Sequence, residues 1–129
     1  MRHAVIQPIN QVGDQTITGG ALDFRFIYRM SCQVAVGAGA ATAGSLKLQV
    51  SNDPISMVNV APSGTISGVV NWVDFGTAVT VSGAAVQNML FATVPWTDMA
   101  FSWVRAIYTD SSSGSGLGLV TVNLNIQGF

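Results

Sequence analysis

The chain is poor in charge and in reactive side chains. Among 129 residues it has six Asp, no Glu, five Lys plus Arg, one His and one Cys. A single cysteine cannot close an intramolecular disulfide, so the fold does not depend on an oxidising compartment. The net charge of −1 and the dispersed cations provide no basic surface, so we expect no nucleic-acid partner. The cations are Arg2, Arg25, Arg29, Lys47 and Arg105.

Long uninterrupted apolar runs are also missing, although hydrophobic residues make up 49% of the chain. The charge-free stretch 75–97 is broken by Gly83, Asn88 and Pro95, so we expect no membrane-spanning helix and no membrane partner. Residues 1–5 lack the apolar core of a secretory signal, which favours synthesis in a cytoplasm. The high apolar content excludes intrinsic disorder, and the length fits one domain over residues 1–129.

The sequence contains no recognisable combination of catalytic residues. A catalytic triad needs a base beside a nucleophile, and the only histidine is His3, near a chain end. The six Asp lie in or near predicted turns and strand ends, so no acid/base pair can be named among them. The glycine-rich stretch 114–118 lies between two predicted strands instead of before a helix, which argues against a phosphate-binding loop. We therefore expect no enzyme activity and no cofactor.

A metal site has one weak candidate ligand, Asp53. Loops of β-sandwiches often gather Asp and Asn oxygens, and Asn52, Asp53 and Asp110 fall in predicted loops, but their spacing matches no EF-hand. Cys32 lacks the partners that a zinc site needs, and it lies on the apolar face of a predicted strand, where we expect it to be buried. The sequence therefore predicts no metal site.

Alternation with a period of two residues is the dominant pattern. From residue 22 to residue 36 every even position is apolar and most odd positions are polar, which predicts one strand with a core face and an outer face. About nine strands and no helix predict an all-β antiparallel sandwich, because two packed sheets bury the alternating apolar residues of both. The predicted strands are 4–9, 15–18, 22–36, 45–50, 69–75, 78–82, 86–94, 101–109 and 117–126.

Two sets of surface side chains are candidates for binding. Trp96 follows a proline and is a possible stacking platform for a ligand such as a sugar, whereas Trp72 and Trp103 lie in apolar β-type segments and are expected in the core. Arg25 and Arg29 share a face of the predicted strand 22–36. That face is either solvated or in contact with an acidic neighbouring chain.

Three stretches resemble the small structural proteins of tailed bacteriophages. They are LKLQVSNDP at 46–54, NWVD at 71–74 and WVRAIYT at 103–109, followed by a Ser/Gly loop and a terminal strand that ends in Gly-Phe. Their order and spacing are also similar, and the resemblance covers residues 20–129. It implies a virion component, a decoration or cement protein on the capsid exterior. It also implies a β-sandwich of jelly-roll type with about eight or nine strands, and a homo-oligomer, often a trimer, that contacts the major capsid protein.

The resemblance gives residues 1–20 the role of an N-terminal arm or a first strand. Val5, Ile6 and Ile9 make a short extended apolar piece that could add to the sheet of another subunit, so we expect them, with Arg25 and Arg29, at the interface. Deleting residues 1–20 should then abolish binding to the shell. The low charge of the chain also fits a surface that partners cover.

Two functional hypotheses of different classes follow. The first is a non-enzymatic virion protein that stabilises the capsid shell through subunit contacts. The second is a carbohydrate-binding or adhesion module of a phage tail, with Trp96 as the binding residue, and a tail or connector subunit is a further alternative. Composition does not distinguish a capsid location from a tail location.

Overall fold

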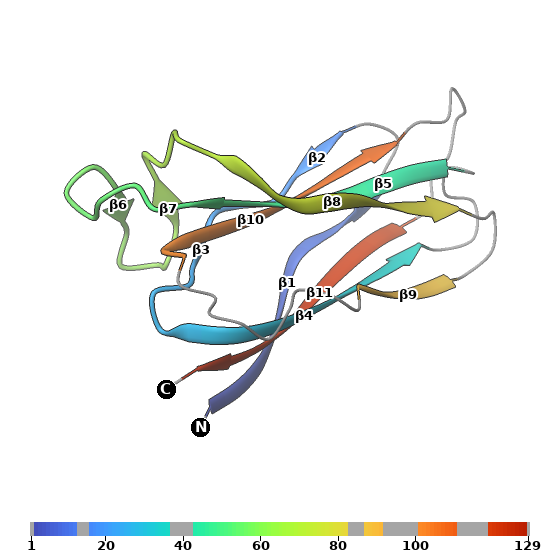
Figure 1. The fold of residues 1–129 in the computed structure, drawn as a ribbon, viewed down its shortest axis with the longest axis horizontal. Helices are drawn as coiled ribbons and strands as arrows, with labels where there is room; N and C mark the ends of the chain where they lie inside the picture. Colours follow the sequence, from blue (N-terminus) through green and yellow to red (C-terminus); the bar gives the residue numbers. More distant parts are fainter. Residues whose placement is uncertain are drawn as a thin grey trace.

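The computed structural model describes residues 2–12, 16–36, 43–82, 87–91, 101–110 and 119–128. Within these ranges every regular element is a β-strand (Figure 1), so the all-β prediction is confirmed. The strands are β1 (Arg2–Val12), β2 (Ile17–Thr18), β3 (Leu22–Asp23), β4 (Ile27–Val36), β5 (Ala43–Ser51), β6 (Asn59–Val60), β7 (Ile66–Ser67), β8 (Val73–Ser82), β9 (Gln87–Phe91), β10 (Trp103–Asp110) and β11 (Leu119–Gly128).

The strands form two stacked antiparallel sheets and a small separate hairpin (Figure 1). Sheet I has the order β1-β11-β4-β9. Sheet II has the order β2-β10-β5-β8, and β3 also pairs with β10. The hairpin consists of β6 and β7 and lies at one end of the sandwich.

The order of pairing is that of a jelly roll. Going inward from the chain ends, β1 pairs with β11, β2 and β3 pair with β10, β4 pairs with β9, and β5 pairs with β8. These antiparallel pairs alternate between the two sheets, and the contacts of β11 with β4 and of β10 with β5 complete each sheet. With β2 and β3 counted as one interrupted strand, the arrangement is an eight-stranded jelly roll, which confirms the expected fold class.

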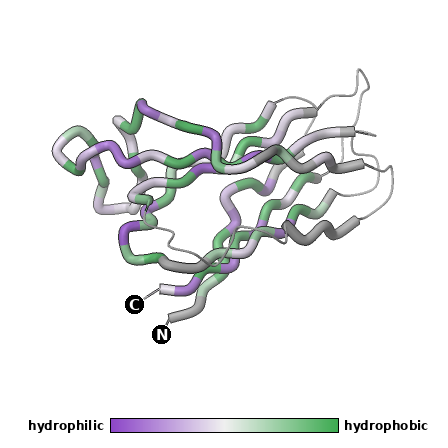
Figure 2. The backbone as a smooth tube through the Cα atoms, in the orientation of Figure 1, coloured by the Kyte–Doolittle hydropathy of each residue, from purple (hydrophilic) through white to green (hydrophobic). Residues whose placement is uncertain are grey.

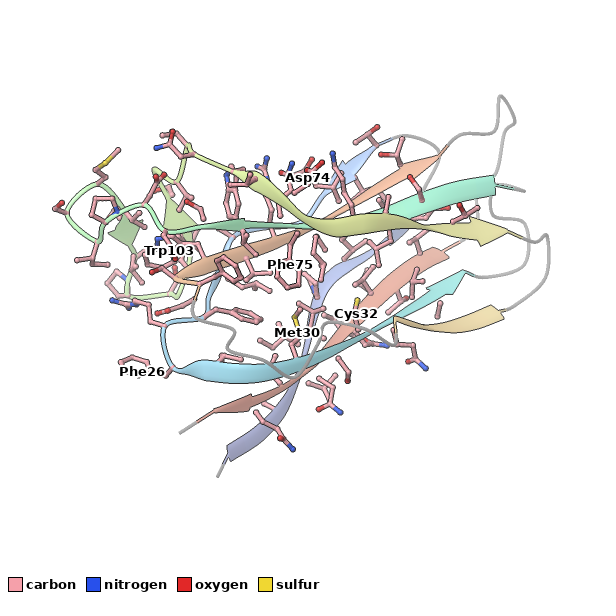
Figure 3. All side chains as sticks on the ribbon, in the orientation of Figure 1. Phe26, Met30, Cys32, Asp74, Phe75 and Trp103 are labelled. Carbon is pink, nitrogen blue, oxygen red and sulfur yellow. The ribbon has the colours of Figure 1, made fainter. Side chains whose placement is uncertain are left out.

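Alternating side chains fill the space between the sheets. Hydropathy alternates along the strands of both sheets (Figure 2), and in Figure 3 Met30 and Cys32 rise from β4 towards the core while Phe75 reaches it from β8. The predicted apolar faces are buried from Met30 to Val34 and from Val120 to Ile126, whereas Phe26 of the first face is exposed. The core comprises Ile9, Ile17, Phe24, Met30, Cys32, Val34, Leu46, Leu48, Val50, Val104, Ala106, Tyr108, Val120, Val122, Leu124 and Ile126.

The prediction of one continuous strand over 22–36 is wrong. The chain forms β3 in sheet II, turns at residues 24–26, and enters sheet I as β4. The Ile27 amide donates to the Phe24 carbonyl at 3.0 Å and closes this turn, while the Phe24 side chain stays in the core. In the sequence the apolar even positions continue through the corner, but in the structure Phe24 and Met30 on either side are buried and Phe26 within the turn is 66% exposed. Periodicity alone therefore could not reveal that the chain changes sheets.

One strand, β8, replaces the two strands predicted at 69–75 and 78–82; it begins only at Val73 and contains a bulge. Leu46 pairs with Val79 and Leu48 pairs with Phe75, so three residues of β8 lie opposite Lys47 alone. Gly76, the first of the three, has a φ of 71°, a left-handed conformation that glycine adopts without the penalty that other residues pay. Residues 76–77, which the prediction left between two strands, are instead part of the bulge.

Candidate functional site

The outer face of sheet II gathers charged and aromatic side chains. On β10, Val104, Ala106 and Tyr108 belong to the core, so Trp103 and Arg105 occupy the opposite face. Arg105, Gln49 and Asp74 lie side by side in register on β10, β5 and β8. In Figure 3 Asp74 lies on the outer side of β8 and its neighbour Phe75 on the core side.

These three side chains form one hydrogen-bonded row across the sheet. Arg105 donates to the Gln49 Oε1 from Nε at 2.9 Å and from Nη2 at 2.7 Å, and the Gln49 Nε2 donates to the Asp74 Oδ1 at 2.8 Å. Lys47 Nζ lies 3.4 Å from the same Asp74 oxygen. The hydrogen bond from Gln49 and the charge of Lys47 lower the pKa of Asp74. The row keeps its carboxylate ionised at neutral pH.

Two arginines of this face stack on tryptophan rings. The Arg105 guanidinium carbon lies 4.4 Å from the centroid of the Trp72 ring, and burial lowers the Arg105 pKa. The Arg25 guanidinium carbon lies 5.2 Å from the centroid of Trp103, which is fully buried. Such cation–π contacts hold planar guanidinium groups in a fixed place on the face.

The charge of Arg25 is paired within its own chain. Arg25 Nε and Nη2 donate to the two carboxylate oxygens of Asp23 at 2.9 and 2.7 Å, and this bidentate contact lowers the pKa of Asp23. The prediction that Arg25 and Arg29 share a strand face is wrong, because Arg25 lies in the turn before β4. Arg29 lies in β4, and its side chain is outside the described part of the structure.

Asp53 ties the turn after β5 to the segment before β8. Its Oδ2 accepts the amides of Val70 and Asn71 at 2.8 and 3.0 Å, and its Oδ1 accepts Asn71 Nδ2 at 2.6 Å. The Asp53 carbonyl accepts the Trp103 indole N–H at 2.8 Å, and its amide donates to Ser51 Oγ at 3.1 Å. The amide of Asn71 and then that of Val70 lower the Asp53 pKa.

These contacts give the candidate metal ligand a structural role. Both carboxylate oxygens of Asp53 already accept N–H donors, so a cation would have to displace them. Across the described residues, no three His, Cys, Asp or Glu side chains gather as they would around a metal ion. Asp53 is a buried hydrogen-bond acceptor that fixes the path of two loops.

The three sequence stretches that resemble phage proteins meet at this place. Asp53 belongs to the first stretch, Asn71 and Trp72 to the second, and Trp103 and Arg105 to the third. Asn52 adds a further link, because its Oδ1 accepts the Ser102 amide at 3.0 Å. Sequence reasoning missed this network, and it placed Trp72 in the core although its ring is half-exposed beneath Arg105. The polar residues inside the three stretches were the available signal.

The outer face of sheet I has a different character. A hollow of about 490 Å³ is lined by side chains that include Val5, Gln7, Gln33, Asn123 and Asn125. Asn123 Nδ2 donates to Gln33 Oε1 at 3.3 Å, and the Asn123 Oδ1 is buried with no hydrogen-bond partner. Cys32 also contributes to the lining, but its side chain is buried and burial raises the thiol pKa to about 12. It is therefore not a nucleophile near neutral pH.

The predicted interface residues at the N-terminus divide between surface and core. Val5 is exposed, Ile6 is partly buried against the core, and Ile9 is a core residue at 2% exposure. Ile9 is therefore not accessible to a partner, which corrects the prediction. A register shift between Ile6 and Ile9, which spans Pro8, turns both isoleucines inward although they are three residues apart. Residues 2–12 form a strand of sheet I, whereas Ile17 and Thr18 form β2 in sheet II.

The possible stacking residue Trp96 lies outside the described residues. Within those residues, the structure contains no helix with the length and hydropathy needed to cross a bilayer. Comparison with protein-family models and with curated proteins finds no match to this chain.

Proposed function

We propose that this protein is a non-enzymatic structural subunit of a tailed-phage virion, a decoration protein bound to the exterior of the capsid. It acts as a homo-oligomer, a trimer in the arrangement that the resemblance implies, and stabilises the shell through contacts with the major capsid protein. Synthesis takes place in the host cytoplasm. The observation that carries the proposal is the convergence of the three phage-like stretches on one network around Asp53 and Trp103.

This convergence supports the resemblance for a physical reason. Stretches far apart in sequence match a shared pattern by chance independently of one another, whereas residues that bond to one another in the fold are constrained together. Asn71 and Trp103 follow Asp53 by 18 and 50 positions in the sequence, and both still bond to it in the fold. The jelly roll agrees with the proposal by analogy, since viral capsid domains use this fold repeatedly.

A second candidate function is carbohydrate binding on a phage tail. The amide-lined hollow on sheet I favours it, because uncharged Gln and Asn side chains can donate to and accept from sugar hydroxyls. Jelly rolls also occur in lectins. We place this function second because the hollow's described lining has no aromatic ring on which a sugar could stack.

The test is binding to empty heads assembled from the major capsid protein of the phage that encodes this chain. We expect the protein to co-sediment with the heads at saturable stoichiometry and to raise the temperature at which they rupture by several degrees. A Trp96→Ala variant should bind the heads equally well. Failure to co-sediment, together with glycan-array binding that Trp96→Ala abolishes, would replace the proposal with the adhesion function.

A further inference from the structure

One end of the sandwich exposes an unusual number of large apolar side chains. Of the seven that are exposed among the described residues, five lie in or beside the segment that connects β5 to β8. We call these five the apolar tip, and their exposed fractions range from 39% to 66%. They are Ile55, Met57, Val60, Val70 and Val73.

Backbone contacts bring the two halves of this segment together. Val60 pairs with Ile66 across the β6–β7 hairpin, and Val70 bonds to Asp53, the residue two positions before Ile55. Gly68 lies so close to Met57 that a Cβ added at Gly68 would stand 2.7 Å from the Met57 carbonyl oxygen. The exposed side chains therefore come from one compact segment at the end of the molecule where Figure 1 shows β6 and β7.

The apolar tip is held in a defined conformation. The Met57 amide donates to the Pro54 carbonyl at 2.9 Å, and the Val58 amide donates to the Ile55 carbonyl at 3.2 Å. Asp53 anchors both ends of the segment through Val70 and Asn71. A preordered apolar surface loses little conformational entropy when it docks, which distinguishes a binding surface from a loosely exposed loop.

The absence of charged residues from the segment that carries the apolar tip indicates which kind of partner it can bind. Residues 54–73 contain no Asp, Glu, Lys or Arg, so two copies of this segment bring no charged side chains of their own into contact, and the nearest charges, Arg105 on Trp72 and Asp74 after Val73, lie at its border. A lipid surface fits less well, because peripheral membrane binding draws on cations beside the apolar residues and this segment has none. The position at one end of an elongated domain also lets several copies converge on one symmetry axis.

We propose that the apolar tip is the surface through which copies of this chain associate with one another. The inference builds on the proposed function, since it names the self-contact of the homo-oligomer. Five exposed apolar side chains are fewer than the roughly 20–30 residues that each side of a standard interface contributes, so the association should be weak and depend on protein concentration.

The test compares the mass of the wild-type chain with that of an Ile55→Asp/Met57→Asp variant by light scattering over micromolar concentrations. Both side chains are exposed, so the substitutions should leave the thermal unfolding of the fold unchanged. We expect the wild type to form oligomers of the 13.4 kDa chain and the variant to raise the dissociation constant at least tenfold. The comparison variant is Val5→Asp, which adds one carboxylate instead of two at a similarly exposed valine on sheet I and should leave the mass unchanged.

Three outcomes would overturn this inference. The first is a wild-type chain that stays monomeric throughout. The second is an oligomer that resists the tip variant but dissociates with Val5→Asp, which would move the contact to β1. The third is binding of a monomeric wild type to phosphatidylcholine vesicles that the tip variant abolishes.

Head binding separates this inference from the proposed function. A tip-dependent oligomer that does not bind empty heads would retain the inference and overturn the function. A protein that binds empty heads, and whose oligomer mass is the same for the wild type and the tip variant, would retain the proposed function and overturn the inference.

Discussion

Asp53 joins three segments that are distant in the sequence. Its carboxylate receives two backbone amides from the segment before β8, and its carbonyl receives the indole N–H of the buried Trp103. Removal of its carboxylate would leave three part-buried N–H donors of Val70 and Asn71 without this acceptor, which costs more than the loss of a fully exposed pair. The residue therefore matters to the apolar tip as well as to the sandwich, because it fixes both ends of the tip segment.

Replacing Asp53 with Asn should lower the melting temperature by roughly 5 °C or more, because an amide side chain cannot accept all the N–H donors that the carboxylate accepts. Differential scanning calorimetry measures this shift. The control is Asp74→Asn. The Asp74 carboxylate is mostly exposed, so this substitution should shift the melting temperature much less. Equal shifts for the two variants would contradict the structural role of Asp53.

The same carboxylate predicts a dependence of stability on pH. Hydrogen bonds from Asn71 and Val70 lower the Asp53 pKa below its ordinary value of 3.8, so the ionised form is favoured in the folded chain. Its contribution is complete above that ordinary value and is lost as the pH falls through the lowered pKa. Denaturant unfolding between neutral pH and pH 3 should show the wild type approaching Asp53→Asn in acid. A stability difference that stays constant would exclude this linkage.

At the scale of elements, glycine decides where strands bend and where the apolar tip closes. Gly76 forms the bulge of β8 with a φ of 71°, and a Cβ there would meet open space. Gly68 has a φ of 90°, and a Cβ there would stand 2.7 Å from the Met57 carbonyl oxygen. The first position needs only a backbone conformation, whereas the second also needs the absence of a side chain.

We therefore expect Gly68→Ala to destabilise the fold more than Gly76→Ala does. Left-handed backbone strain alone accounts for about 1–2 kcal/mol at Gly76, and the contact with Met57 adds to this at Gly68. Denaturant midpoints with unchanged m values measure both effects. Gly20→Ala is the control, because Gly20 has open space around it and no left-handed φ, and its midpoint should barely move. A neutral Gly68→Ala variant would argue against the described conformation of the tip.

At the scale of the whole molecule, the two ends of the chain close the sandwich together. β1 pairs along its length with β11, from Arg2 opposite Gly128 to Val12 opposite Leu119, and the termini lie side by side in Figure 1. β1 also contributes Ile9 to the core. A segment with these contacts is part of the fold as well as a possible contact for other subunits.

Deleting residues 2–12 should therefore abolish cooperative folding, so the loss of shell binding expected for deletion of residues 1–20 would follow from unfolding instead of from loss of an interface arm. Removal of the strand uncovers one edge of β11 and takes Ile9 from the core, and domains have only about 5–15 kcal/mol of stability to lose. Thermal unfolding followed by circular dichroism measures the change, with Val5→Ser as the control that keeps the strand. A deletion variant that melts cooperatively would restore the interpretation of this segment as an arm.

The sequence by itself determined the fold class and the faces of the long strands. The two-residue period places Cys32, Leu48 and Leu124 on the core side, because burial of alternate side chains is the local signature of a half-buried strand. The same pattern could not place the corner at residues 24–26 or turn Ile9 inward, since both depend on which strand lies alongside. It also divided β8 at Gly76, where only the pairing with β5 distinguishes a bulge from a break.

Only the tertiary structure decided which polar residues act together. Asp53, Asn71 and Trp103 are ordinary turn and strand residues in the sequence, and their bonds exist because the jelly roll brings the end of β5, the start of β8 and the start of β10 to one end of the sandwich. The exposure of Ile55, Met57 and Val70 has the same origin. An apolar residue is buried only where another element covers it, and no described element covers this end.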